Sequence, residues 1–239
     1  NAHRINQGLY PHAFLEDTIR DFHLTYLPAD TDLKSVVKSH LDKLKNKWDP
    51  ISDIQVLCPM IRGQNGTLAL NEFLQAELNP TQESKIGHFR LGDKVIQHQN
   101  NYDKKVYNGD IGIIEEAEKS RMVVNFGHIT AEYQTDELHE VQLAYATTIH
   151  KSQGSEYPVV IIPILISHYM LLERNLLYTA ITRAKCRVIL ITDKKALFFT
   201  LKNQNAKARQ TQLAEKIQLA TSGEIDYSSV GNVEEDHAD

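Results

Sequence analysis

Val159-Val-Ile-Ile-Pro-Ile164 is a continuous apolar run in which five of the six residues are Val or Ile. A strand with one solvated face would alternate apolar and polar residues, so this run predicts a strand that is buried on both faces. Such strands belong to parallel sheets covered by helices. No apolar run reaches the 18 residues that suggest a membrane-spanning helix. The sequence therefore predicts an α/β fold.

The segments after residue 143 continue the α/β pattern. Strands are predicted at Tyr145–Ile149 and Arg187–Thr192, and a helix at Leu176–Lys185 whose apolar residues share one face. A polar helix is predicted at Lys202–Leu219. Residues 221–239 hold six acidic residues and no Lys or Arg, which predicts a disordered acidic tail.

The first 80 residues also alternate helix and strand patterns. A helix capped by Asp30 or Thr31 is predicted from the apolar spacing between Leu33 and Leu44. A short strand follows at Ile54–Leu57, and a second helix at Leu68–Leu78, which ends before Asn79-Pro80.

The middle of the chain has a different pattern, with short strands separated by turn residues. Strands are predicted at Asp93–Gln97, Gly112–Ile114 and Met122–Phe126, and turns at Asn108-Gly-Asp110 and Phe126-Gly-His128. About 55 residues of such hairpins predict a small closed β-barrel of SH3-like size. The expected division is an α/β domain at 1–87 and 143–220, an inserted barrel at 88–142 and the tail at 221–239.

The net charge of −5 is unevenly distributed. The tail carries −6 and residues 88–142 carry −4, which leaves +5 on the α/β part. A mildly basic body is compatible with phosphate binding but is weak evidence for it. Cys58 and Cys186 lie in or beside apolar runs, so both are expected to be reduced core residues of a cytoplasmic protein.

The segment Ala146-Thr-Thr-Ile-His-Lys-Ser-Gln-Gly-Ser-Glu156 has the composition of a phosphate-binding connection. Thr148, His150 and Lys151 offer donors to phosphate oxygens. Gly154 permits a close backbone approach, and Glu156 can accept hydrogen bonds from a ribose. On composition alone, a polar loop with a helix cap is an equally good interpretation.

Arg183 falls near the end of the predicted helix Leu176–Lys185, with Lys185 beside it. A planar guanidinium there can serve a charged ligand at a domain edge. On its own, an ordinary surface Arg at a helix C-terminus is the better interpretation.

Taken together, the two segments resemble motifs V and VI of superfamily 1 helicases. The resemblance includes Leu176-Leu-Tyr-Thr-Ala-Ile-Thr-Arg-Ala-Lys185 and the strands after each motif. Phe89-Arg-Leu-Gly-Asp-Lys-Val95, Asn100–Gly112 and Asn1–Pro11 resemble the SH3-like insertion and the lead-in segment of RecD-like helicases. The likeness continues at Val56-Leu-Cys-Pro-Met-Ile-Arg-Gly63 and covers about residues 1–219. It implies a second RecA-like domain of a 5′-to-3′ DNA helicase.

The resemblance also implies roles for individual residues. Arg183 would be an arginine finger at the γ-phosphate of ATP, and Gly154 and Glu156 would lie beside the nucleotide. The residues expected at single-stranded DNA are Thr148, His150, Lys151, Arg62, Asn101, Tyr102 and Lys104, with Lys94 and Lys105 also considered. Tyr102 or Tyr107 could stack on a base, but a core position for either is an equal alternative.

Half of an ATP site is missing from the sequence. No Gly-Lys dipeptide is present, so there is no Walker A loop, and Asp136-Glu137 does not follow an apolar strand. Mg²⁺ and the phosphates would be held by a preceding RecA-like domain, and no metal site is expected in this chain. The chain, which does not begin with Met, is expected to be a fragment with negligible ATPase activity of its own.

Two other interpretations remain at this point. The chain could be a non-catalytic module that binds single-stranded DNA or a partner protein. It could also be a degenerate, structural helicase paralogue that scaffolds a repair complex, although intact Arg183, Gly154 and Glu156 speak against decay. No Gly-x-Ser-x-Gly or metal-ligand spacing supports other catalytic chemistry.

Overall fold

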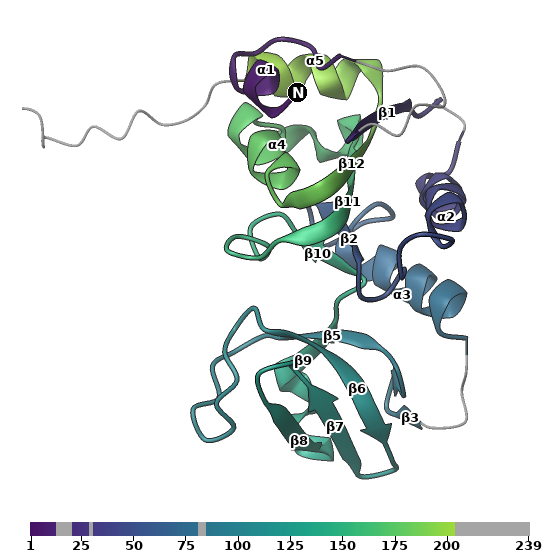
Figure 1. Cartoon of the computed structure of the whole chain (residues 1–239), viewed down its shortest axis with the longest axis vertical. Coiled ribbons are helices and arrows are strands. Elements are labelled where there is room, and N and C mark those ends of the chain that lie inside the picture. Colours follow the sequence, from purple (N-terminus) through teal and green to yellow (C-terminus); the bar gives the residue numbers. More distant parts are fainter. Residues whose placement is uncertain (13–20, 29–30, 81–84, 204–239) are drawn as a thin grey trace, which may run out of the picture. The chain divides into compact units, whose positions relative to one another are not determined.

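The computed structural model describes residues 1–12, 21–28, 31–80 and 85–203 (Figure 1). The predicted acidic tail lies outside these residues, as does nearly all of the predicted helix Lys202–Leu219; Lys202 itself ends an earlier helix, α5 (Lys194–Lys202). Among the described residues, no helix has both the length and the apolar character needed to cross a membrane.

A five-stranded sheet of parallel pairs confirms the predicted α/β class. Its spatial order is β1-β12-β11-β2-β10. The strands are β1 (Phe22–Tyr26), β2 (Ile54–Cys58), β10 (Ala146–Thr148), β11 (Tyr157–Ile164) and β12 (Ala184–Thr192). The apolar run is therefore the central strand, while β1 was not predicted.

Alternate residues of β11 enter two separate cores. Val160, Ile162 and Ile164 pack in the core that also contains apolar residues of α1 (Ala2–Asn6), α4 (Arg174–Ile181) and α5. Val159 and Ile161 pack in the core formed with α2 (Leu33–Leu44) and α3 (Thr67–Leu78). Because both faces are covered, both parities of the strand must be apolar, as the sequence shows.

The ends of three predicted helices require correction. Helix α2 is capped by Asp32, whose carboxylate accepts a hydrogen bond from the amide of Ser35, and not by Thr31; Asp30, the other predicted cap, lies outside the described residues. Helix α3 begins one residue earlier than predicted, after Gly66. Helix α4 ends at Ile181, so Arg183 lies beyond the helix, in the turn that leads into β12.

The middle of the chain forms a five-stranded antiparallel sheet in the order β8-β7-β6-β5-β9. Its strands are β5 (Lys94–Gln97), β6 (Ile111–Ala117), β7 (Arg121–Asn125), β8 (Thr130–Gln134) and β9 (Val141–Leu143). A two-stranded ladder, β3 (Lys85–Ile86) with β4 (Phe89–Arg90), precedes it. The expected hairpins and glycine turns are present, with φ of +103° at Gly109 and +82° at Gly127. The expected closure is not observed, because β8 and β9 do not pair among the described residues.

Asp93, which is fully buried, joins the antiparallel sheet to the α/β part. Its carboxylate accepts hydrogen bonds from four donors, two of which lie at the C-terminal end of α3. They are Gln75 Nε2 at 2.6 Å, Asn79 Nδ2 at 2.8 Å, the Tyr145 hydroxyl at 2.8 Å and the Arg90 amide at 2.8 Å. These donors replace the water that the carboxylate loses on burial, and so they offset its desolvation.

Lys94 makes a second buried link across the same junction. Its Nζ donates to the Ile54 carbonyl of β2 at 3.2 Å and lies 5.6 Å from the ring centroid of Tyr157 in β11. Burial lowers its pKa to about 8, against the opposing influence of Asp49 and Asp53. With 3% of its surface exposed, Lys94 cannot contact DNA, so that prediction was wrong.

His40 of α2 makes the stability of the fold depend on pH. Its Nε2 lies 2.9 Å from Thr25 Oγ1. Burial, followed by the charges of His23 and Lys43, lowers its pKa to about 4; Arg187 acts on neighbouring His23. The unfolded chain binds this proton near pH 6.5, so stability falls as the pH drops from 6.5 towards 4, by on the order of 1–3 kcal/mol.

The matched variant is His40→Gln, which keeps a hydrogen-bonding group beside Thr25 but does not titrate. Urea unfolding of both proteins at several pH values between 7 and 4 should show a steeper loss for the wild type. Parallel curves for the two proteins would contradict the role of His40.

Candidate functional site

Residues 149–156 connect the C-terminal end of the edge strand β10 to the N-terminal start of the central strand β11. Thr148, at the end of β10, pairs with Cys58, the last residue of β2. Tyr157, the first residue of β11, pairs with Ala184 at the start of β12. The connection is a compact run of turns, with the Ser152 hydroxyl donating to the Ile149 carbonyl at 2.7 Å. One short loop thus carries a group of polar side chains at each end.

Arg183 lies at the β11 end of this loop. Its Nη1 donates to the Ser155 carbonyl at 3.2 Å, Nε to the Thr179 carbonyl at 3.2 Å, and Nη2 to the Thr182 hydroxyl at 3.3 Å. The guanidinium has five N–H donors, so contacts within the described residues engage three of them. The side chain is half-buried, which orients the fork and leaves part of it accessible.

The neighbouring residues complete a polar edge. The Arg183 carbonyl accepts a hydrogen bond from the Tyr157 amide at 2.8 Å, which fixes the turn against β11. Glu156 is exposed, and its carboxylate lies 3.6 Å from Lys185 Nζ. Gly154 has φ of +89°, a conformation that favours glycine, and is also exposed. The structure therefore brings together Gly154, Glu156 and Arg183.

The other end of the loop carries Thr148 and Lys151. The Thr148 hydroxyl accepts the Lys151 amide at 3.2 Å, which caps the turn. Lys151 Nζ lies 2.9 Å from His98 Nδ1, and burial lowers the pKa of this lysine. Burial, followed by the charge of Lys151, lowers the pKa of His98, so a neutral imidazole accepts from the ammonium. Thr148 and Lys151 lie together on one cavity wall.

His150 and Arg62 have separate surroundings. His150 is exposed and lines a different cavity of about 260 Å³ with Gln153 and residues before and within α4. Arg62 is exposed in the loop after β2. Its neighbour Gly66 must be glycine, because an added Cβ would lie 2.4 Å from the Ile61 carbonyl and 2.5 Å from the Arg62 carbonyl.

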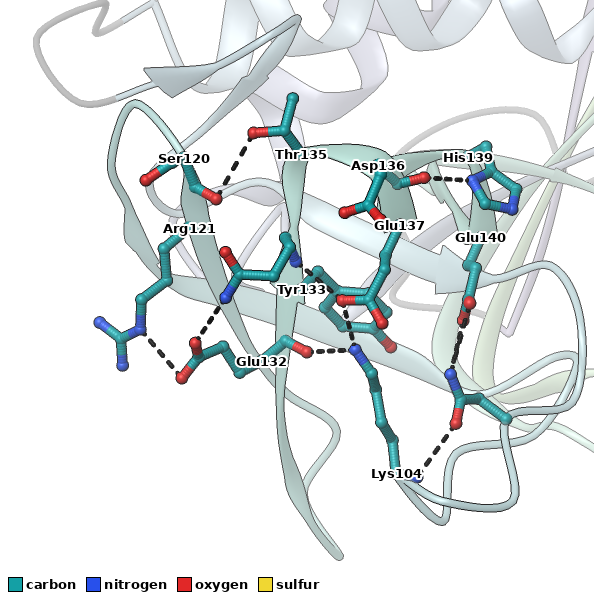
Figure 2. Close-up of polar contacts among 12 residues, drawn as sticks. Lys104, Ser120, Arg121, Glu132, Tyr133, Thr135, Asp136, Glu137, His139 and Glu140 are labelled. Carbon is teal, nitrogen blue, oxygen red and sulfur yellow. Dashed lines mark hydrogen bonds and ion pairs between the residues drawn. The ribbon is translucent and has the colours of Figure 1, made fainter.

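Lys104 and Asn101 are held by contacts within the antiparallel sheet and its connections. Lys104 Nζ lies 2.7 Å from Glu137 Oε2, donates to the Glu132 carbonyl at 2.5 Å and sits 4.6 Å from the Tyr133 ring centroid (Figure 2). Asn101 donates to Glu140 at 3.0 Å. Among the described contacts, neither side chain forms a hydrogen bond with Thr148 or Lys151.

Tyr102 and Tyr107 add exposed aromatic rings to this region. Tyr102 is 73% exposed and Tyr107 is 46% exposed, so the alternative of a core position for either is wrong. Their rings meet edge to face at a centroid distance of 6.2 Å. Lys105 is exposed with φ of +56°.

The two cysteines differ. Cys58 is buried at the end of β2, and burial raises the pKa of its thiol to about 12. Cys186 is exposed near the start of β12, so the prediction that both belong to the core was wrong for it. The first four residues of β12 are exposed or half-buried, and the strand is buried only from Val188 onwards. Cys186 lies in the exposed part, so the apolar run that follows does not bury it.

Sequence reasoning missed His98, which orients Lys151. A lone His after a strand carries no signal of its own, because its partner is 53 residues away. Within the described residues, no three His, Cys, Asp or Glu side chains are grouped so that they could hold a metal ion.

Two family profiles match the chain. The UvrD-like helicase C-terminal domain matches residues 143–191, which contain β10, the loop 149–156, β11, Arg183 and most of β12. The SH3 domain of ATP-dependent RecD-like DNA helicases matches residues 70–126. The chain is a homologue of the RecD-like helicases. The RecD-like SH3 match begins inside α3, so it includes Gln75 of α3 and the following Asn79, which both donate to Asp93.

Individual RecD-like proteins extend the comparison. The chain is 38% identical over 167 residues to the ATP-dependent RecD2 DNA helicase of Deinococcus radiodurans, covering 69% of this chain and 23% of that protein. It is 32% identical over 159 residues to the RecBCD enzyme subunit RecD of Mycolicibacterium smegmatis, covering 66% and 28%. The chain thus spans about a quarter of the length of these relatives.

Among solved structures, the Pif1 helicase from Bacteroides in complex with ADP-AlF3 and single-stranded DNA matches with a TM-score of 0.45 and 21% identity. The match covers 80% of this chain and 51% of that one. This likeness is too distant to assign the role of any residue.

Proposed function

We propose that the chain is the C-terminal motor part of an ATP-dependent DNA helicase, and that it completes an ATP site formed mainly by a preceding RecA-like domain. Residues 1–87 and 143–220 would form the motor domain, and residues 88–142 the SH3-like insertion. The observation that carries the proposal is the position of the Arg183 guanidinium beside Ser155, next to Glu156. The same loop begins after Thr148, so it carries two groups of side chains: Gly154, Glu156 and Arg183, here called the nucleotide edge, and Thr148 and Lys151, here called the DNA edge.

Each residue of the nucleotide edge has a chemical task in this proposal. ATP would supply the phosphoanhydride bond whose cleavage drives movement. Arg183 would direct its remaining N–H donors to the γ-phosphate, where an arginine finger contributes about 10³ to 10⁵ in rate in other NTPases. Glu156 would accept a hydrogen bond from the ribose, and Gly154 would permit close backbone approach. Mg²⁺ would be held by the preceding domain.

The DNA edge would hold the backbone of a single strand. Thr148 and Lys151 would contact phosphates, and His98 would orient the lysine. His150 and Arg62, which are both exposed, would contact the DNA strand at other points of the surface. Tyr102 offers an exposed ring for stacking. Translocation from 5′ to 3′, a cytoplasmic location and association with other recombination or repair subunits belong to the same proposal.

The test compares ATPase activity of this chain with that of a longer polypeptide that includes the preceding domain. The isolated chain is expected to hydrolyse ATP negligibly because it lacks a Walker A loop. The longer protein should hydrolyse ATP and be stimulated by single-stranded DNA. DNA binding without any gain in ATPase activity would instead favour a non-catalytic binding module.

A further inference from the structure

A cavity of about 370 Å³ lies beside the proposed phosphate contacts. Thr148 and Lys151 form one part of its lining, α3 contributes Leu68, and η1 (Thr135–Glu140) contributes Leu138 and His139. Ligand pockets span about 300 to 1,000 Å³. This cavity is at the lower end of that range, which suits a single planar group and not a whole nucleotide chain.

The lining combines a cation with exposed apolar surface. Ile61 and Leu68 both line the cavity, and each is 51% exposed. Single exposed apolar side chains are common, but two at one cavity beside a lysine form an amphipathic site. A nucleotide of single-stranded DNA has the matching character, with an anionic phosphate attached to a flat base.

His139 offers an aromatic face in a fixed orientation. Its Nδ1 lies 2.7 Å from the Asp136 carbonyl within η1 (Figure 2). The turn is itself held by a capping box, in which the Gln134 amide donates to Glu137 at 2.8 Å. An imidazole that is oriented before binding loses little rotamer freedom when a base stacks on it.

We propose that this cavity binds one nucleobase of single-stranded DNA, stacked on His139 and packed against Leu68 and Ile61. The attached phosphate would lie on Thr148 and Lys151. Glu72 and Gln142, which also line the cavity, offer hydrogen-bonding groups to the edge of the base. The inference rests on the proposed DNA edge and assigns the antiparallel sheet a direct part in holding the strand.

The experiment measures binding of two fluorescent oligonucleotides to the whole chain at low salt. One is oligothymidine, and the other has the same length but carries abasic residues. We expect the base-containing strand to bind about tenfold more tightly, which corresponds to about 1.4 kcal/mol. His139→Ala and Leu68→Ser should reduce this difference to about threefold or less, and His139→Phe should retain it because a ring remains.

Matched controls separate the cavity from general effects. His128→Ala and Leu91→Ser change exposed residues of the same types outside the cavity, and both should keep the tenfold difference. Lys151→Ala should weaken both oligonucleotides by the same factor and flatten the salt dependence, because it removes a phosphate contact.

Equal affinity of the wild type for the two oligonucleotides would overturn the base site while leaving the proposed DNA edge intact. An unchanged difference in both His139→Ala and Leu68→Ser would also overturn it. Failure of the wild type to bind either strand at low salt would contradict the cavity and the DNA edge together.

Discussion

Replacing Arg183 with Ala in the protein that includes the preceding domain is expected to lower the ATPase rate constant by about 10³-fold or more. The guanidinium is held beside Ser155 by hydrogen bonds and retains donors that no described contact engages. Those donors are the ones available to charge that develops on a γ-phosphate, and Ala has none. Affinity for ATP should change much less than turnover, because the contact matters mainly during the reaction.

Arg187→Ala is the matched control, since Arg187 is a second half-buried arginine, and its charge acts on His23. Steady-state hydrolysis with saturating single-stranded DNA measures both variants. Arg183→Lys should recover little activity, because an ammonium lacks the planar fork. Near-normal turnover in Arg183→Ala would remove the finger assignment.

Asp93→Ala is expected to lower the free energy of unfolding by about 3–5 kcal/mol. The carboxylate is fully buried and accepts hydrogen bonds from Gln75, Asn79, Tyr145 and the Arg90 amide. Removing it takes this acceptor from all four donors and leaves a void where the carboxylate was, although Gln75 and Asn79 each still donate to a backbone carbonyl. Urea unfolding of the chain measures the loss.

Asp103→Ala provides the control, because Asp103 is exposed, and it should change stability by less than about 0.5 kcal/mol. Asp93→Asn should fall between the two, since it retains one carbonyl oxygen as an acceptor. A loss below about 1 kcal/mol for Asp93→Ala would show that the network does not hold the junction.

The sequence was informative where burial imposes a pattern. Because β11 is covered on both faces, its residues Val159–Ile164 could only be apolar, and the α/β class followed from them. Gly154, Glu156 and Arg183, which the structure brings together, were also singled out from the sequence by their resemblance to known motifs, and their role at a nucleotide stays a prediction. The antiparallel sheet was detected from its short strands and its glycine turns.

The wrong predictions concern side chains whose contacts are with residues distant in the sequence. All four residues of β5 are buried, so no alternation in the sequence could show that Lys94 points into the junction. Asp93 was predicted only as the first residue of a strand. Its hydrogen-bond donors include Gln75 and Tyr145, which lie far from it in the sequence, so no local pattern indicates its buried position. The helix before Arg183 was predicted to continue to Lys185, but it ends at Ile181. The Arg183 carbonyl accepts a hydrogen bond from the Tyr157 amide, and this long-range contact has no signal in the local sequence.

A fluorophore on Cys186 tests most directly whether the Arg183 edge faces a bound nucleotide. This thiol is exposed near the start of β12, whereas Cys58 is buried, and Cys186→Ser provides the unlabelled blank. In the protein with the preceding domain, a non-hydrolysable ATP analogue with Mg²⁺ should change the emission, and the isolated chain should show no change. Unchanged emission in a labelled protein that still hydrolyses ATP would contradict a nucleotide site at this edge.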